Sequence, residues 1–153
     1  MDLILWRHAE AELARLGHDD MQRSLTAKGQ RQAKRMAEWL DERLPQSTRI
    51  LVSPALRTQQ TAQALARRFK TVNTLGPGFG ADDLLQAARW PDAEEPVLVV
   101  GHQPTLGVVA ARLLALADHP WSVKKGAVWW LSRRERDGVV QLTLQAVHGP
   151  DKF

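Results

Sequence analysis

Two histidines and two arginines have the chemistry needed to bind and transfer an oxyanion: Arg7, His8, Arg57 and His102. Arginine donates several hydrogen bonds in one plane, which suits a phosphoryl group. A neutral histidine can also act as a nucleophile, and neighbouring guanidinium charges disfavour its protonated form. These residue types therefore predict a phosphoryl-binding site in which His8 remains reactive.

The candidate residues follow short apolar runs that have the length of buried strands. The runs are 3–6, 50–52 and 97–100. In parallel α/β sheets, ligands bind outside the carboxyl ends of the strands, so residues that follow different strands can meet there. Ser53 follows the second run, and the helices expected after Ser53 and His102 would add backbone N–H donors.

The remaining pattern alternates helical spacing with further strand-like runs. Thr26 has the character of a helix N-cap, and Pro45 is expected to end that helix. Further helices are predicted over 62–69, 84–88 and 106–116, and a terminal hairpin is predicted from 127–131 and 139–144 around a polar stretch at 132–138. The expected fold is α/β: a single three-layer domain over 1–153, with a mostly parallel sheet flanked by helices and antiparallel strands near the C-terminus.

Composition excludes several classes of protein. The chain has 153 residues, 44% of them hydrophobic and 25% charged, which fits one globular domain. It has no cysteine, so disulfides, thiolate metal sites and cysteine nucleophiles are excluded. The first residues have neither the basic start nor the apolar length of a signal peptide or membrane span, so the expected location is cytoplasmic.

The net charge of +4 is concentrated in the first half of the chain. Residues 1–70 carry 13 basic and 8 acidic residues, whereas 71–153 carry 8 and 9. This density is below that of a nucleic-acid-binding arm, so nucleic acid is not the expected partner. A cluster of basic residues on the first helix is interpreted as a solvated face, with docking of an acidic partner as the alternative: Lys28, Arg31, Lys34 and Arg35.

A metal site is not expected. His8-Ala9-Glu10 has the H-x-E spacing of zinc deaminases, but that chemistry also needs a pair of cysteine ligands, which the chain lacks. His18, His119 and His148 are interpreted as ordinary loop or core residues. The sequence therefore predicts a reaction without metal or other cofactor.

Four motifs in order resemble those of the histidine phosphatase superfamily. They are Leu5-Trp6-Arg7-His8-Ala9, Leu25-Thr26-Ala27-Lys28-Gly29, Ser53-Pro54-Ala55-Leu56-Arg57-Thr58-Gln59-Gln60-Thr61-Ala62 and Val100-Gly101-His102-Gln103-Pro104. The short chain is similar to the small SixA-like branch of protein-phosphohistidine phosphatases. The motifs span residues 3–104, and the elements around them extend the resemblance over most of the chain.

The resemblance implies a role for each residue of the site. His8 would attack phosphorus and become transiently phosphorylated, while Arg7, Arg57 and His102 would hold the phosphoryl oxygens. Water would then hydrolyse the intermediate. Arg23 matches an arginine that faces the phosphate in small members, and Ser53 is interpreted either as a substrate-binding residue or as a helix cap.

The sequence departs from the family pattern at two points. The usual glycine after the nucleophile is Ala9, which is also small. Larger members place an acidic proton donor after the third strand, where this chain has only Asp82 and Asp83, and both could simply begin a helix. Because phosphohistidine releases imidazole from a labile P–N bond and needs less acid catalysis, a missing donor favours a phosphoramidate substrate.

The sequence therefore predicts a metal-independent phosphatase that acts on phosphohistidine in a protein. One alternative is a phosphatase of a small phosphomonoester or phosphoanhydride. Another is a catalytically idle module that binds phosphorylated partners.

Overall fold

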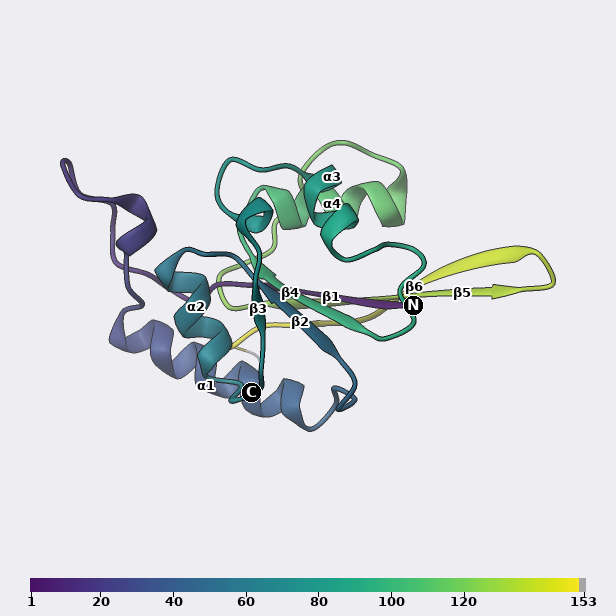
Figure 1. The fold of residues 1–153 in the computed structure, drawn as a ribbon, viewed down its shortest axis with the longest axis horizontal. Helices are drawn as coiled ribbons and strands as arrows, with labels where there is room; N and C mark the ends of the chain where they lie inside the picture. The colour runs from purple at the N-terminus through teal and green to yellow at the C-terminus, as the bar shows by residue number, and fades with distance from the viewer. Residues whose placement is uncertain (152–153) are drawn as a thin grey trace.

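A computed structural model describes residues 1–151 and contains one six-stranded sheet (Figure 1). The strands are β1 (Asp2–Arg7), β2 (Arg49–Val52), β3 (Lys70–Thr71), β4 (Val97–Gly101), β5 (Val128–Arg136) and β6 (Val139–His148). Their order is β3-β2-β4-β1-β5-β6, with parallel pairing from β3 to β1 and antiparallel pairing of β5 and β6. The predicted mixed sheet is confirmed.

Helices cover both faces of the sheet. On one face lie α1 (Ala27–Asp41) and α2 (Leu56–Gln63), and on the other lie α3 (Ala81–Ala87) and α4 (Thr105–Ala115) (Figure 1). Two short 3-10 helices, η1 (Asp20–Gln22) and η2 (Asn73–Leu75), lie in the connections. The predicted three-layer α/β fold is confirmed. Among the described residues, no helix has the length and apolar character needed to cross a membrane.

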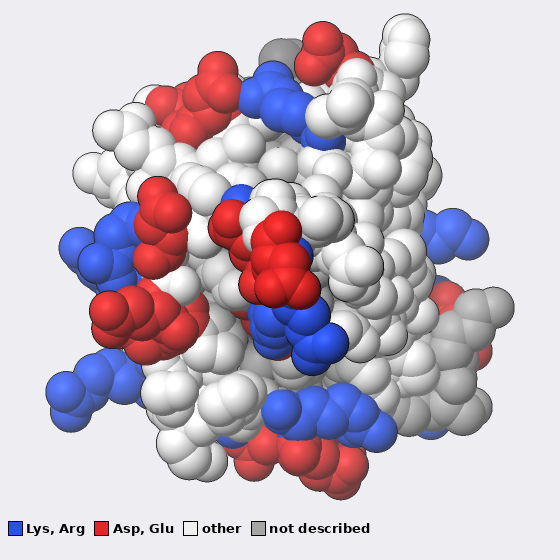
Figure 2. Space-filling model, turned by 90° about the vertical axis from the view of Figure 1, so that its right-hand side faces the viewer, with Lys and Arg blue, Asp and Glu red and all other residues white. Residues whose placement is uncertain are grey.

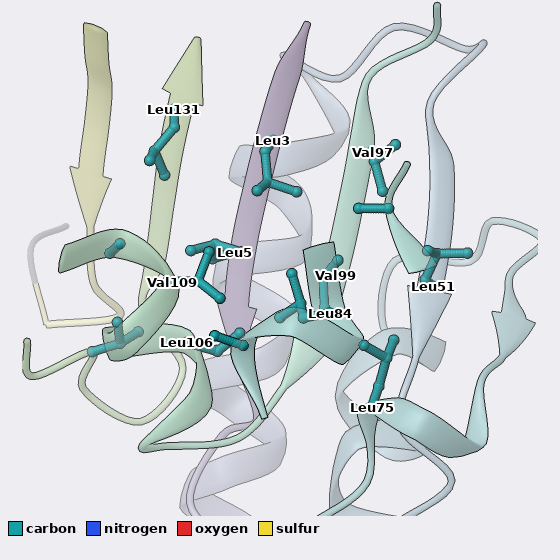
Figure 3. Packing of buried hydrophobic residues seen from close by; sticks show 14 of the residues in the cluster. Leu3, Leu5, Leu51, Leu75, Leu84, Val97, Val99, Leu106, Val109 and Leu131 are labelled. Carbon is teal, nitrogen blue, oxygen red and sulfur yellow. The ribbon is translucent and has the colours of Figure 1, made fainter. Parts of the chain in front are cut away.

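Alternate residues of the central strand β1 enter the two cores. Leu3 and Leu5 pack with α3 and α4, as Figure 3 shows, whereas Ile4 and Trp6 pack with α1 and α2. All four side chains are fully buried. At about 25 cal/mol per Å² of apolar surface, burial on both faces makes β1 one of the most strongly held elements. The residues that directly follow β1 are therefore attached to a rigid strand.

Two sequence predictions about element boundaries were wrong. The helix expected to run to Phe69 ends at Gln63, and Ala66 has a positive φ of 54° because the chain turns back to pair β3 with β2. The polar stretch 132–138 is not a loop: β5 continues through Arg136 and the chain reverses at Asp137 and Gly138. The hairpin projects beyond the helices (Figure 1), so polar side chains on both faces are compatible with strand.

The start of α1 is tied to the segment that follows β1. Thr26 caps the helix as predicted, since its Oγ1 accepts a hydrogen bond from the Gly29 backbone N–H at 2.9 Å. The same hydroxyl donates to the Glu10 carboxylate at 2.7 Å. The backbone of Glu10 passes so close to Gly29 that an added Cβ would lie 1.9 Å from the Glu10 carbonyl oxygen. Only glycine fits at this position. The motif Leu25–Gly29 therefore supplies both the helix cap and the glycine that lets the Glu10 backbone approach the helix.

We predict that Gly29→Ala destabilises the fold by about 1–3 kcal/mol, the usual cost of overpacking. A loss of stability would be informative, because replacing glycine with alanine in a helix normally raises the free energy of unfolding by up to about 1 kcal/mol. Urea unfolding followed by circular dichroism measures the effect. Gly149→Ala is the control, since an added Cβ there has no neighbour within 4 Å. A Gly29→Ala variant as stable as the parent would show that the close approach is not rigid.

Candidate active site

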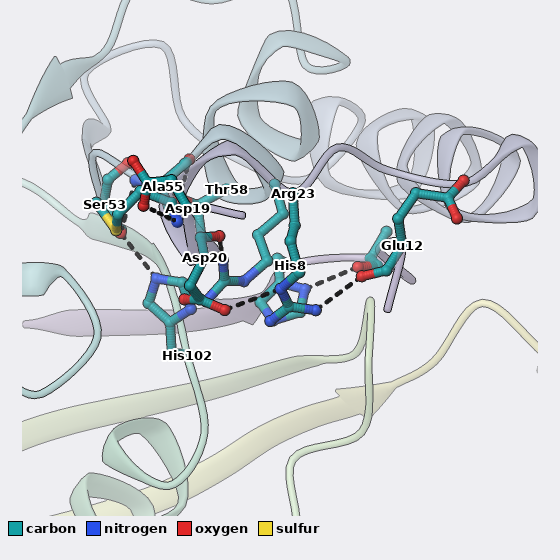
Figure 4. A network of polar contacts seen from close by, with 12 residues as sticks. His8, Glu12, Asp19, Asp20, Arg23, Ser53, Ala55, Thr58 and His102 are labelled. Carbon is teal, nitrogen blue, oxygen red and sulfur yellow. Dashed lines mark hydrogen bonds and ion pairs between the residues drawn. The ribbon is translucent and has the colours of Figure 1, made fainter. Parts of the chain in front are cut away.

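The two candidate histidines lie side by side at the carboxyl edge of the sheet. His8 follows β1 and His102 follows β4, and these strands are parallel neighbours in which Arg7 is aligned with Gly101. The ring centroids are 5.4 Å apart, and both residues are buried. The structure therefore brings together two residues that are far apart in the sequence, as the strand pattern predicts (Figure 4).

The tautomer of His8 follows from its neighbour. Its Nδ1 lies 2.7 Å from the carbonyl oxygen of Ala9. Because a carbonyl oxygen only accepts hydrogen bonds, Nδ1 must carry the proton, and Nε2 keeps a lone pair. The Ala9 backbone is itself held, since its N–H donates to Thr61 Oγ1 on α2 at 3.1 Å. The backbone thus orients the His8 ring and leaves Nε2 free of this contact.

Ser53 contacts His102 rather than an open surface. Its buried Oγ lies 2.7 Å from His102 Nε2 and also accepts a hydrogen bond from the Ala55 backbone N–H at 3.3 Å. The hydroxyl can donate its proton to Nε2, and a neutral His102 then carries its ring proton on Nδ1, from which it can donate a hydrogen bond. The geometry fits a positioning role for Ser53.

Arg57 reaches the site from the first turn of α2. Its side chain is 5% exposed, its Nη1 donates to the Asp20 carbonyl oxygen at 2.9 Å, and its Nη2 lies 3.2 Å from Asp20 Oδ2. Arg7 is anchored through Nη1 to the Val123 carbonyl oxygen at 3.0 Å. The buried Nε atoms of Arg7 and Arg57 have no hydrogen-bond partner among residues 1–151. The site therefore holds unused guanidinium donors.

Arg23 also belongs to this network. Its Nε contacts Asp20 Oδ1 at 2.9 Å, and its Nη1 donates to the Glu12 carbonyl oxygen at 2.9 Å (Figure 4). The Arg23 charge also contributes to lowering the pKa of His8. Arg23, Arg57 and both histidines thus share one electrostatic environment, together with Arg7.

Asp20 is the residue that sequence reasoning missed. Its carboxylate bridges Arg23 and Arg57, although its side chain is 51% exposed. Burial alone would raise the pKa of Asp20, but the hydrogen bond from Arg23 and the charge of Arg57 lower it. The available signal was its position three residues before Arg23, which suits contact within a helical turn.

Asp82 and Asp83 both have structural contacts near the start of α3. Asp83 accepts a hydrogen bond from the Gly80 backbone N–H at 2.9 Å, and Asp82 lies 2.6 Å from Nη1 of Arg112 on α4. A carboxylate at a helix start also complements the helix dipole. These contacts agree with the interpretation of both residues as helix-start residues.

Burial and positive charge keep both histidines neutral. Desolvation, followed by the charges of Arg57 and Arg7, lowers the pKa of His8 to about 4 despite the bond to Ala9. Desolvation and then Arg57 lower the pKa of His102 to about 3. At neutral pH the His8 ring is therefore neutral, with a proton on Nδ1 and a lone pair on Nε2. Within the described residues, no group of histidine and acidic side chains could hold a metal ion.

We predict that folding stability falls as the pH is lowered from 7 to 5. Histidines with an ordinary pKa near 6.5 take up protons in the unfolded chain, whereas folded His8 and His102 titrate only near pH 4 and 3. The unfolded state thus binds more protons, and the stabilisation present above pH 6.5 is lost towards pH 4. Urea midpoints at pH 7 and pH 5 measure this fall.

The control for this pH effect uses two exposed histidines. The double variant His8→Asn/His102→Asn should lose much of the pH dependence, whereas His18→Asn/His119→Asn should retain it. Equal pH dependence in both double variants would contradict the assignment of the effect to the buried pair.

Known proteins match this chain in sequence and in fold. Residues 3–79 match the family model described as "Histidine phosphatase superfamily (branch 1)". The chain is 29% identical over 129 residues to the phosphohistidine phosphatase SixA homolog of Haemophilus influenzae, covering 74% of this chain and 77% of that protein. It is 30% identical over 121 residues to phosphohistidine phosphatase SixA of Escherichia coli, covering 74% of each.

A solved structure extends the likeness to nearly the whole fold. The structure of the protein histidine phosphatase SixA complexed with tungstate is 25% identical and superimposes with a TM-score of 0.77. The match covers 99% of this chain and 98% of that chain. The chain is therefore a phosphatase that belongs to the histidine phosphatase superfamily, in its SixA-like branch.

Proposed function

We propose that this phosphatase hydrolyses phosphohistidine in proteins through a covalent intermediate on His8. The observation that carries the proposal is the contact of His8 Nδ1 with the Ala9 carbonyl oxygen at 2.7 Å, because it fixes Nε2 as the free nucleophilic atom. This atom belongs to a cluster with Arg7, Arg57 and His102, which suits a phosphoryl group. The proposed domain comprises residues 1–153, the last two of which lie outside the described part.

The proposed reaction has two displacements at phosphorus. In the first, His8 Nε2 attacks phosphorus, the P–N bond of the substrate breaks, its imidazole leaves with a proton taken up from solvent, and phospho-His8 forms. In the second, water attacks phosphorus, phosphate leaves, one water proton is lost to solvent and His8 is restored. Arg7, Arg57 and the Nδ1–H of His102 stabilise the charge on the equatorial oxygens throughout, which is the main task in phosphoryl transfer.

The choice of phosphohistidine rests on the leaving group. Asp82 and Asp83 are bound to Arg112 and to the Gly80 backbone, so neither has an evident role as a proton donor. Imidazole leaves from a P–N bond with less help than an alkoxide requires. The names of the relatives from Haemophilus influenzae and Escherichia coli, phosphohistidine phosphatases, support the same substrate class.

We predict that His8→Ala abolishes turnover, because the nucleophile is lost, while phosphate binding partly survives through Arg7, Arg57 and His102. Rapid quenching of the parent enzyme during hydrolysis of a phosphohistidine protein should trap acid-labile, base-stable phosphate on the chain. EDTA in the assay tests independence from metal. Residual activity in His8→Ala, or label on a serine or aspartate, would rule out the mechanism. Phosphate binding without any turnover by the parent would favour the idle binding module.

We predict that Asp82→Asn and Asp83→Asn each leave phosphohistidine hydrolysis within about twofold of the parent. The reason is that each carboxylate makes a structural contact and imidazole needs no dedicated acid. Initial rates on phosphohistidine, an alkyl phosphate and p-nitrophenyl phosphate measure the effect. A loss of about 10²-fold on phosphohistidine, the low end of general acid catalysis, would identify a proton donor and reopen the small phosphoester alternative.

We predict that Asp20→Asn tightens inhibition by inorganic phosphate by about 3–10-fold. The Asp20 carboxylate occupies donors of Arg57 and Arg23 that a phosphoryl group could use, and its charge repels the ligand. The inhibition constant measured with p-nitrophenyl phosphate tests this. Asp41→Asn is the control, since Asp41 makes a comparable contact with Arg67 at 2.9 Å. Weaker inhibition in Asp20→Asn alone would show that Asp20 mainly positions Arg57.

A further inference from the structure

The loop formed by residues 12–24 exposes two leucines beside the site. Leu13 is 82% exposed and Leu16 is fully exposed, whereas the leucines of β1, β2 and β4 are buried. The loop projects from the body of the molecule beyond α2 (Figure 1). Single exposed leucines are common on protein surfaces. Two of them on one short loop next to a reaction centre require a further explanation.

The base of this loop is fastened to the catalytic residues. The Glu12 N–H donates to the Ser24 carbonyl oxygen at 2.8 Å, which closes the loop. Arg23 then spans it to the Glu12 carbonyl oxygen at 2.9 Å, and Asp20 contacts Arg57 at 3.2 Å. The base is therefore held at a defined place relative to the phosphoryl cluster, and Leu13 and Leu16 follow Glu12 within four residues.

The loop also encloses a hollow of about 670 Å³. Its walls include Leu13, Arg15 and His18 from the loop, and they reach Asp20 and Arg23 at the site. The hollow thus borders Asp20, which contacts Arg57, and it is large enough for several side chains of a bound polypeptide. Its lining mixes acidic, basic and apolar groups, so charge alone does not determine what fits.

We propose that the loop of residues 12–24 binds the polypeptide around the phosphohistidine, with apolar side chains of the substrate against Leu13 and Leu16. This inference rests on the proposed function and names the part of the substrate that the loop recognises. The occupant follows from position: Asp20 joins the loop to Arg57, so a chain whose phosphoryl group reaches the arginine cluster brings its neighbouring residues close to the loop. Apolar contact there adds affinity for protein substrates without touching the reacting atoms.

The end of the molecule with the β5–β6 hairpin provides a control surface away from this loop. Figure 2 shows the end at which the β5–β6 hairpin projects, and there acidic and basic side chains alternate over the surface in view. Leu116, at the far end of α4, and Val139, after the hairpin turn, are also exposed, at 93% and 59%. They provide a matched apolar pair remote from the site.

The experiment compares two double variants on three substrates with the same P–N bond. The variants are Leu13→Ser/Leu16→Ser and the control Leu116→Ser/Val139→Ser. The substrates are free phosphohistidine, a peptide of about fifteen residues with a central phosphohistidine among leucines, and the same peptide with serine in place of leucine. Seven or so residues on each side span about 25 Å when extended, which is long enough to pass the loop.

We expect Leu13→Ser/Leu16→Ser to lower kcat/KM on the leucine peptide by about tenfold or more. On the serine peptide and on free phosphohistidine, kcat/KM of this variant should stay within about twofold of the parent value. The control variant should stay within the same range on all three substrates. An equal loss on all three substrates, or no loss on the leucine peptide, would overturn the role of the loop while leaving the proposed function standing. A parent enzyme that hydrolyses p-nitrophenyl phosphate but none of the three would overturn the proposed function and the loop's role together.

Discussion

The chemistry of this site depends on one hydrogen bond, from Nδ1 of His8 to the carbonyl oxygen of Ala9. A backbone carbonyl cannot donate, so the bond fixes both the tautomer and the ring orientation with a group that no side-chain substitution removes. The segment His8-Ala9 directly follows β1, whose residues are buried in both cores. The Ala9 backbone N–H also donates a hydrogen bond to Thr61. The rigidity of the central strand is thereby passed to His8, the proposed nucleophile.

Burial and the positive charge of the nearby arginines both lower the pKa values of the two histidines. They lower the pKa of His8 to about 4 and that of His102 to about 3, so both rings are neutral at physiological pH. The same guanidinium groups that, with burial, keep the His8 ring neutral are the groups proposed to bind the phosphoryl oxygens. Asp20 moderates this excess of positive charge in the absence of substrate, because its carboxylate lies between Arg23 and Arg57.

The positions of β1, β2 and β4 and the meeting of His8 with His102 could be predicted from the sequence, because apolar runs followed by polar residues have a fixed meaning in a parallel sheet. The end of α2 could not, since the pattern through Phe69 is helical and only pairing of β3 with β2 overrides it. From the sequence, Asp20 could be paired only with Arg23, three residues further on. Its importance arises from contacts with Arg57, 37 positions away, which no local pattern encodes.

The most direct measurement is the identity of the phosphorylated atom in the trapped intermediate. Alkaline digestion of the quenched enzyme followed by chromatography against both phosphohistidine isomers, with the modified residue located by mass spectrometry, distinguishes Nε2 from Nδ1. The predicted product is the Nε2-linked isomer at residue 8, because Nδ1 is bound to Ala9. The Nδ1-linked isomer, or phosphate on His102 in place of His8, would contradict the proposed origin of the nucleophile.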